Sequence, residues 1–278
     1  MTALLFTLIL LGVSTIAGLL GSLTGLGGGV VLIPVLTLIF KVDIHYAIGT
    51  SLISVIATSS GAAAAYVKEG ISNIRLGMFL ELATTIGAIS GAFLATYIPT
   101  STIAIIFGVI LILSAVMSLI KHSDHLVTGR GGYLARKLKL NNRYPTQDGE
   151  QQYTVKNIVG GFLMMNVAGI ISGLLGIGSG ALKVIAMDHI MQVPFKVSTT
   201  TSNFMIGVTA VASAGIYLKR GYIDPGLSMP VVIGVLVGAI VGSKILFAAR
   251  TKALKIIFAI VILILSMEMM YNGLTHKV

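Results

Sequence analysis

Charged side chains are scarce in this chain of 278 residues, and cysteine is absent. Asp, Glu, Lys and Arg make up 10% of the sequence, whereas a soluble domain contains about 25%. The missing cysteine excludes disulfides and thiolate metal sites. The low charge, together with a mean hydropathy of +0.98, excludes a soluble enzyme, a disordered chain and a nucleic-acid-binding domain.

Apolar residues take the place of the missing charges. They make up 55% of the sequence, and the mean hydropathy is +0.98. Four long stretches contain no Asp, Glu, Lys or Arg, at 1–40, 82–120, 157–182 and 197–218. A stretch of about 18 such residues or more can cross a hydrocarbon layer ~30 Å thick. The sequence therefore predicts an all-α polytopic membrane protein whose partner is the lipid bilayer.

One polar stretch interrupts the apolar sequence. Seven of the 19 basic residues lie between Lys121 and Lys156, together with three acidic residues. Basic connections beside membrane spans stay in the cytoplasm, because positive charge resists translocation. We therefore expect residues 121–156 to form a basic cytoplasmic loop. The loop would separate a first membrane repeat, 1–120, from a second, 157–278.

The two apolar halves resemble each other. A shift of 151 positions aligns them without a gap, so that the glycine cluster at 25–29 meets 176–180. The same shift brings the pair Thr50-Ser51 onto Thr201-Ser202. Internal repeats of this kind are typical of secondary transporters.

Each half is predicted to contain five helical segments. They are expected at 2–23, 30–40, 47–66, 76–96 and 101–120, and at 157–175, 181–191, 197–218, 226–247 and 253–271. The second segment of each half has 11 residues, which span ~16 Å at 1.5 Å per residue and so reach about halfway across a membrane. We interpret these two segments as half-helices, each starting after its glycine-rich break.

The charges at equivalent turns predict that the halves are inverted. The turn at 97–101 carries no charge, but its counterpart carries Arg250, Lys252 and Lys255. If basic turns stay inside, these two turns face opposite sides of the membrane. An odd number of segments per half gives the same result. A parallel repeat with four passes per half is the alternative.

The glycine-rich breaks are the first candidate site. The residues concerned are Gly27, Gly28, Gly29, Gly178, Ser179 and Gly180. A break inside a membrane leaves backbone groups unpaired, and it survives only inside protein or beside a wet cavity. The helix that restarts after the break directs N–H groups and its positive dipole end toward the break, which favours an anion. We expect both breaks to converge on one site near the midplane; close helix packing is the alternative role of these glycines.

Polar side chains near the breaks could contribute to the same site. Thr50, Ser51, Thr201, Ser202 and Asn203 could donate hydrogen bonds to an oxyanion without the cost of a buried charge. Helix capping, or bonds to nearby carbonyl groups, would equally explain them.

Two ionisable residues within the membrane segments are further candidates. Lys183 lies in the first turn of a half-helix, where a cation is unfavourable unless a bound anion offsets it. It could instead snorkel or pair with an acid such as Asp188. Glu81 lies two turns inside its segment and could pair with a cation or carry a proton. The histidines form no convincing metal set, no catalytic arrangement is evident, and no cofactor is expected.

The glycine pattern indicates a family. Gly-Leu-Leu-Gly-x3-Gly-Leu-Gly-Gly-Gly-x4-Pro at 18–34, with its echo at 173–180, resembles the sulfite exporter TauE/SafE family of membrane permeases. The resemblance implies export or uptake of small sulfur oxyanions and organosulfonates across a bacterial or archaeal inner membrane. The chain departs from the duplicated pattern at Ser179, which replaces a glycine, and at Ile185, which replaces the proline of the first copy.

The leading interpretation is a secondary transporter for a small anion, with sulfite, another sulfur oxyanion or an organosulfonate as the class that the resemblance suggests. No nucleotide-binding signature is visible, so an ion gradient or the membrane potential would supply energy. A passive anion channel of the same architecture is the alternative, and an integral-membrane enzyme would require a catalytic constellation that we do not find. A homo-oligomer is compatible with the sequence, and no nucleic-acid partner is expected.

Overall fold

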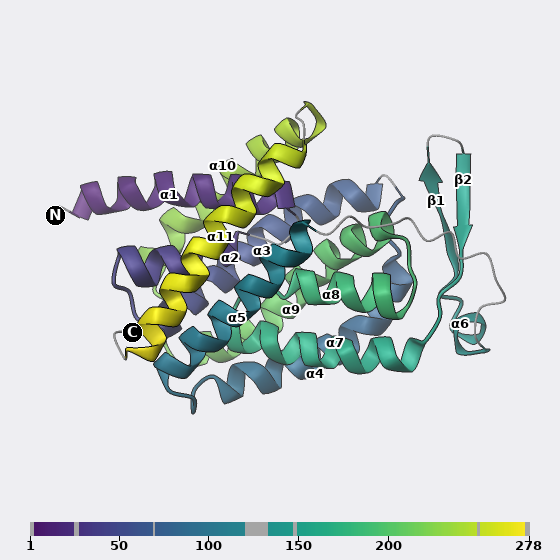
Figure 1. Cartoon of the computed structure of the whole chain (residues 1–278), viewed down its shortest axis with the longest axis horizontal. Helices are drawn as coiled ribbons and strands as arrows, with labels where there is room; N and C mark the ends of the chain where they lie inside the picture. Colours follow the sequence, from purple (N-terminus) through teal and green to yellow (C-terminus); the bar gives the residue numbers. More distant parts are fainter. Residues whose placement is uncertain are drawn as a thin grey trace.

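The structure is a computed structural model that describes residues 3–24, 28–68, 70–119, 133–146, 149–248 and 251–275. The predicted segments of the first half are all helical (Figure 1). They are α1 (Ala3–Thr24), α2 (Gly29–Pro34) with its π-helical continuation η1 (Val35–Ile39), α3 (Ile44–Lys68), α4 (Ile74–Leu94) and α5 (Thr100–Leu119).

The second half repeats this order of helices. Its elements are α7 (Ile158–Leu175), α8 (Gly180–Ile185) with its π-helical continuation η2 (Ala186–Ile190), α9 (Phe195–Lys219), α10 (Pro225–Ala248) and α11 (Thr251–Leu274). Both short helices continue into a π-helical turn at the same place in the repeat, and the turns end at Ile39 and Ile190.

Several helices have the length and composition of membrane spans. Within the described residues, four segments are long and apolar enough to cross a membrane, at Leu4–Gly21, Ile74–Leu94, Ile158–Leu175 and Phe195–Lys219. Shorter apolar stretches occur in α2–η1, α5, α10 and α11. The chain is thus a mostly helical protein with several helices able to span a membrane.

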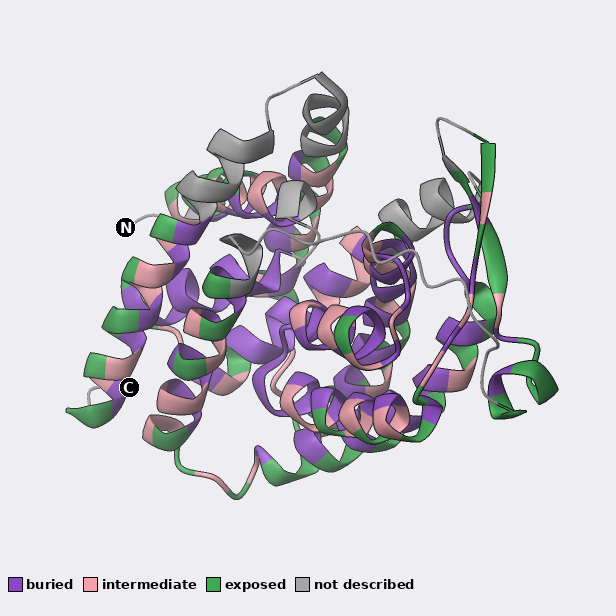
Figure 2. Cartoon of the chain, turned by 45° about the vertical axis from the view of Figure 1, so that its right-hand side comes forward, coloured by how far each residue is buried: buried purple, intermediate pink, exposed green. Residues whose placement is uncertain are grey.

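The exposed faces of these helices, green in Figure 2, carry many large apolar side chains. On α4 the exposed side chains include Met78, Leu82, Ile86, Ile89 and Phe93, which recur every three or four residues and so share one face. The opposite face carries small residues and the buried carboxylic acid Glu81. Apolar residues outside and a polar residue inside are what a lipid solvent favours.

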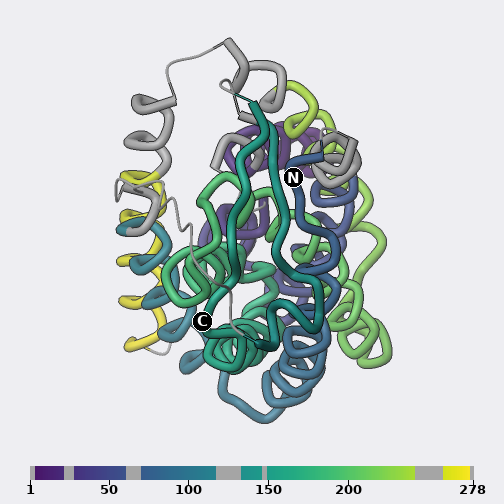
Figure 3. The backbone as a smooth tube through the Cα atoms, turned by 90° about the vertical axis from the view of Figure 1, so that its right-hand side faces the viewer, coloured from purple at the N-terminus to yellow at the C-terminus, as the bar shows by residue number. Residues whose placement is uncertain are grey.

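The main helix contacts join one half to the other. Helix α1 packs against α10, α4 against α7, α5 against α11, and α3 against α9. The pairing of α5 with α11 is visible at the lower left of Figure 1 and again in Figure 3. The core lies between the halves and is built mainly of aliphatic side chains.

Glycines allow two of these helix pairs to approach closely. A Cβ atom at Gly87 would lie 2.2 Å from the carbonyl oxygen of Asn166, and one at Gly238 would lie 2.0 Å from that of Thr15. Gly238 is the repeat counterpart of Gly87, and Asn166 is that of Thr15. The same backbone contact therefore holds α4 on α7 and α10 on α1.

Helices that are repeat counterparts of one another, and that pack together, run antiparallel. Along α5 and α11, Gly273 lies against Ser101 whereas Gly108 lies against Met270. Along α3 and α9, the position of Gly49 meets Tyr222 and that of Gly207 meets Ser59, so sequence numbers again run in opposite directions.

The polar connection between the halves folds over one end of the helices (Figure 3). It contains a short helix, α6 (Tyr133–Lys137), and an antiparallel hairpin of β1 (Asn142–Thr146) and β2 (Gly149–Tyr153). The side-chain amide of Asn73, at the start of α4, donates hydrogen bonds to the Leu140 carbonyl at 2.9 Å and to the Tyr153 hydroxyl at 2.8 Å. The first part of the predicted loop, 121–132, lies outside the described residues.

The hairpin corrects the prediction of an all-α chain. A turn signal is present in the sequence, because the dipeptide Asp-Gly at 148–149 favours hairpin turns. In the structure Gly149 is the first residue of β2, is paired with Thr146, and has a positive φ of 114°. On the strands, Tyr144 and Tyr153 are buried while Arg143 pairs with Glu150 on the exposed side. The many basic residues of this stretch favour a charged loop in the sequence analysis, so the alternation of buried and exposed strand residues was not predicted.

Candidate anion site at the two helix breaks

The first break lies directly before α2. Gly27 is outside the described residues, but Gly28 and Gly29 are buried. The carbonyl of Gly28 accepts hydrogen bonds from the N–H groups of Val31 and Leu32, which starts the short helix. A Cβ atom at Gly29 would lie 2.2 Å from the hydroxyl oxygen of Ser51, so only glycine fits at this point.

The second break uses left-handed backbone. Gly176, Gly178 and Ser179 have φ values of 68°, 71° and 45°, a region that glycine adopts freely and serine rarely. The Ser179 hydroxyl donates a hydrogen bond of 2.6 Å to the Ala168 carbonyl in α7. This bond anchors the one non-glycine residue among these three left-handed positions.

The two breaks lie next to each other. A Cβ atom at Gly29 would lie 3.3 Å from the carbonyl oxygen of Gly176. Ser51, from α3, donates a hydrogen bond of 2.9 Å to that same carbonyl. Gly29 and Gly176, which are 147 positions apart in the chain, thus lie side by side, and Ser51 of α3 lies beside both.

The hydroxyl groups that were predicted to contact an anion have different hydrogen-bond partners in the structure. Ser202 donates to the Gly180 carbonyl at 3.3 Å and so belongs to the second break. Thr201 instead accepts a hydrogen bond from the Asn73 N–H, at 3.0 Å, on the side facing α4. Thr50 lies 3.4 Å from the hydroxyl of Ser228 in α10. Asn203 is half-buried, and no side-chain hydrogen bond to the described residues involves it.

Lys183 is completely buried, and its partner is not the one expected. Its ammonium group donates a hydrogen bond to the hydroxyl oxygen of Thr209, at 2.5 Å. The Thr209 hydroxyl lies 2.7 Å from Oε1 of Glu81. Asp188, which the sequence suggested as a partner of Lys183, contacts His189 at 3.4 Å. Sequence reasoning did not identify Thr209, although its repeat counterpart is also a threonine, Thr58.

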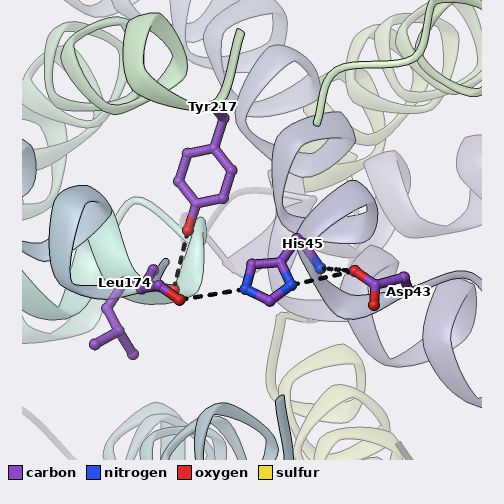
Figure 4. Close-up of polar contacts among 5 residues, drawn as sticks. Asp43, His45, Leu174 and Tyr217 are labelled. Carbon is purple, nitrogen blue, oxygen red and sulfur yellow. Dashed lines mark hydrogen bonds and ion pairs between the residues drawn. The ribbon is translucent and has the colours of Figure 1, made fainter. Parts of the chain in front are cut away.

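The end of α7, just before the second break, has its own polar support (Figure 4). The Tyr217 hydroxyl donates to the carbonyls of Gly173 and Leu174, at 3.2 and 3.4 Å. Beside it, Nδ1 of His45 lies 3.2 Å from Oδ1 of Asp43, and Nε2 lies 3.2 Å from the Ala95 carbonyl. Both partners of the imidazole are hydrogen-bond acceptors.

The site thus combines two adjacent helix breaks, hydroxyl groups that hold their backbone, and one buried cation. The cation is linked through Thr209 to a buried acid, so the site carries both signs of charge. Such a constellation can bind a small anion or relay a proton.

Known proteins similar to this chain are membrane transporters. The probable membrane transporter protein YunE of Bacillus subtilis is 28% identical over 274 residues, covering 96% of this chain and 98% of the relative. YdhB of the same organism, also a probable membrane transporter protein, is 29% identical over 227 residues, covering 82% and 85%. A probable membrane transporter protein of Methanocaldococcus jannaschii is 25% identical over 283 residues, covering 94% of each chain.

No solved structure matches this chain. The family model described as sulfite exporter TauE/SafE matches residues 10–269, nearly the whole sequence. Because the match covers both halves and the connection between them, the chain belongs to the sulfite exporter TauE/SafE family, a family of membrane transporters and not of enzymes.

Proposed function

We propose that the protein is a secondary transporter that moves a small anion across the inner membrane of the cell. Sulfite, another sulfur oxyanion or an organosulfonate is the substrate class, because the family is described by sulfite export. The observation that carries the proposal is the complete burial of Lys183 beside the second break. An ammonium group inside a membrane segment costs roughly 2.5–3.5 kcal/mol on insertion scales. Glu81 offsets part of this cost through Thr209, and a bound anion would offset more of it.

The substrate site lies at the midplane, where the two breaks meet. The contact between Gly29 and the Gly176 carbonyl supports a single shared site. Helical backbone restarts at Gly29 and at Gly180, and both short helices act as half-helices that present N–H groups toward the anion. Ser51 and Ser202 hold the carbonyl groups of the breaks, which keeps these N–H groups oriented.

The two halves form an inverted repeat. A two-fold axis parallel to the helices would leave counterpart helices parallel, whereas an axis in the membrane plane makes them antiparallel. The antiparallel pairs α5–α11 and α3–α9 support the second case. The basic connection, 121–156, then lies on the cytoplasmic side by virtue of its positive charge.

The test is uptake by the purified protein in proteoliposomes. Sulfite, sulfate, thiosulfate, taurine and sulfoacetate are offered in turn, with protein-free liposomes as the control. A secondary transporter takes up labelled anion faster when the lumen is loaded with unlabelled anion. Flux without this stimulation identifies the passive channel, and no flux above the protein-free control for any of the five contradicts the proposal.

A further inference from the structure

Three polar side chains from three helices form a chain inside the protein. Lys183 of α8 donates to the Thr209 hydroxyl, at 2.5 Å, and this hydroxyl lies 2.7 Å from Oε1 of Glu81 in α4. The exposed fractions are 0% for Lys183, 0% for Thr209 and 7% for Glu81. One hydroxyl therefore joins a buried cation to a buried anion.

The polar atoms of these three side chains do not all have hydrogen-bond partners among the described residues. Oε2 of Glu81 is buried and has no hydrogen-bond partner among the described residues. The Lys183 ammonium has three N–H donors, but within the same described residues it makes one hydrogen bond. A purely structural ion pair would saturate both groups, because unpaired buried polar atoms are costly. Within the described residues, N–H donors of Lys183 and the Oε2 acceptor of Glu81 therefore remain available for further hydrogen bonds.

Comparison of the two halves shows that neither charge is repeated at the equivalent position of the other half. The counterpart of Lys183 is Leu32, and the counterpart of Glu81 is Val232. Thr209 has a threonine, Thr58, as its counterpart. Thus both halves carry the hydroxyl, but only Thr209 has an acid, from the first half, and a base, from the second half, beside it. The residues that correspond to this acid and base, at Val232 and Leu32, are uncharged, so the charged group of side chains departs from the symmetry of the repeat.

The ammonium group lies on the break side of its helix. Along α9, Gly180 contacts Ser202, Gly178 contacts Ile206, and the Lys183 ammonium contacts Thr209. The side chain therefore runs back toward the start of α8, as helical side chains do. The ammonium reaches the level of the break, and Glu81 lies immediately behind it.

No other charged group competes for Glu81 within the described residues. Helix α7, which packs on α4, contains no ionisable residue, and Arg75 of α4 is exposed and bonds to the Lys139 carbonyl. On α9 the two lysines, Lys196 and Lys219, lie at the helix ends, 13 and 10 residues from Thr209. On the η2 continuation of α8, Asp188 and His189 contact each other. Lys183 is the charge linked to Glu81.

We propose that Lys183, Thr209 and Glu81 form the coupling unit of the transporter, in which an anion bound at Lys183 is accompanied by one proton on Glu81. This inference rests on the proposed function. Without substrate the unit is neutral, since the ammonium and the carboxylate cancel. A singly charged anion on Lys183 makes the unit negative, and a proton taken from water by the Glu81 carboxylate restores neutrality. No covalent bond of the substrate changes.

The charge count sets the expected stoichiometry. One proton and one monovalent anion cross together, so transport is electroneutral and a pH gradient drives accumulation. Thr209 is a positioning residue, because its hydroxyl holds the Lys183 ammonium and the Glu81 carboxylate close together. The protonation of Glu81 can therefore respond to an anion bound at Lys183.

Isethionate is the probe of choice for the test. Sulfonic acids are strong acids, so the charge of this anion is constant across the pH range used, and any pH effect belongs to the protein. In proteoliposomes of the full chain, counterflow of labelled isethionate at equal pH measures exchange. Accumulation driven by an acidic exterior, with proton entry followed by a luminal pH dye, measures coupling.

Wild-type protein is expected to show exchange, accumulation driven by the pH gradient, and one proton per anion regardless of membrane potential. Glu81→Gln keeps the shape of the side chain but cannot lose or gain the proton. We expect this variant to retain counterflow, which also shows that it is folded, and to lose gradient-driven accumulation completely. Thr209→Val is expected to lower accumulation at least several-fold more than counterflow and to shift its pH profile, and Thr209→Ser is expected to restore both.

Thr58→Val is the matched control, because it makes the same change at the uncharged counterpart of Thr209; it should behave as wild type. Accumulation by Glu81→Gln equal to wild type overturns the coupling unit, as does equal behaviour of Thr209→Val and Thr58→Val. Potential-dependent wild-type transport without proton entry overturns it without any variant. Absence of wild-type counterflow for isethionate and for all five anions named above overturns the proposed function and this inference together. If one of the five is exchanged and isethionate is not, the coupling measurements are made with that anion.

Discussion

The Ser51 hydroxyl donates a hydrogen bond of 2.9 Å to the carbonyl oxygen of Gly176. This bond ties a helix of the first half to the break of the second. The same hydroxyl occupies the space where a side chain at Gly29 would lie. Ser51 thus couples the geometry of both breaks, and disturbing either break should affect the other.

Gly29→Ala should impair transport and lower the free energy of unfolding by about 1–3 kcal/mol, the usual cost of overpacking. The added Cβ would lie 2.2 Å from the Ser51 hydroxyl and 3.1 Å from a methyl group of Val55. Thermal unfolding in detergent and anion uptake are the measurements. Adding Ser51→Ala should restore part of the stability. Gly12→Ala in α1 is the control, since no atom lies within 4 Å of its added Cβ; equal effects at positions 12 and 29 would disprove the steric argument.

Gly87→Ala and Gly238→Ala should destabilise the protein to a similar extent, by about 1–3 kcal/mol each. In both cases the added Cβ would collide with the carbonyl oxygen of a partner helix. Gly215→Ala, on the exposed face of α9, meets no atom within 4 Å and should be neutral or stabilise by up to about 1 kcal/mol. Thermal unfolding of the three variants in one detergent tests the equivalence. A large loss at one glycine with none at the other would contradict it.

Labelling of single cysteines should show that α11 runs opposite to α5. The chain contains no native cysteine, so each variant carries one thiol. Thr100→Cys and Thr275→Cys should react with an impermeant reagent from the same side, because the end of α11 packs beside the start of α5. Thr251→Cys, at the start of α11, should react from the other side. Arg250 of the adjacent basic turn lies outside the described residues. Labelling of positions 100 and 251 from one side would rule out the inverted repeat.

Lys183→Met should weaken anion binding by roughly 1.5–3 kcal/mol, the range for a hydrogen bond to a charged group. It should also destabilise the protein, because Glu81 loses the cation to which Thr209 links it. Glu81→Gln added to Lys183→Met should recover stability but not affinity. Thermal unfolding with and without increasing anion measures both quantities. Unchanged affinity in the single variant would move the anion site away from Lys183.

Tyr153→Phe should loosen the hairpin by about 1 kcal/mol, because Asn73 loses the hydroxyl that accepts its hydrogen bond. Burial raises the pKa of Tyr153 above its ordinary value near 10, since the phenolate would be desolvated. The neutral phenol therefore stabilises the docked hairpin fully below about pH 10, and this contribution is lost as the pH rises above that value. Hydrogen exchange of β1 and β2 measures the effect. Tyr133→Phe, which changes an exposed tyrosine of the same connection, should have no effect.

Most of the fold could be predicted from the sequence, because a chain inside a lipid bilayer has few choices of secondary structure. Uninterrupted apolar stretches and glycine breaks located every predicted segment to within a few residues, since a helix in lipid must satisfy its own backbone. The hairpin was missed because its alternating pattern is short and lies among charges. The partner of Lys183 was missed for a different reason: Thr209 and Glu81 lie 26 residues after it and 102 before it, and only the packing of α4 on α9 brings them together.

The pairing of helices across the halves has a consequence for biogenesis. Helices α1, α4 and α5 find their main partners in α10, α7 and α11, all of which are synthesised later. While the ribosome completes the second half, the glycine-lined faces of the first half face lipid or the insertion machinery. Helix α5 must wait for α11, which is synthesised more than 130 residues later. A product truncated before α11 would therefore be a natural target of membrane proteases, because α5 can complete its packing only after α11 has entered the bilayer.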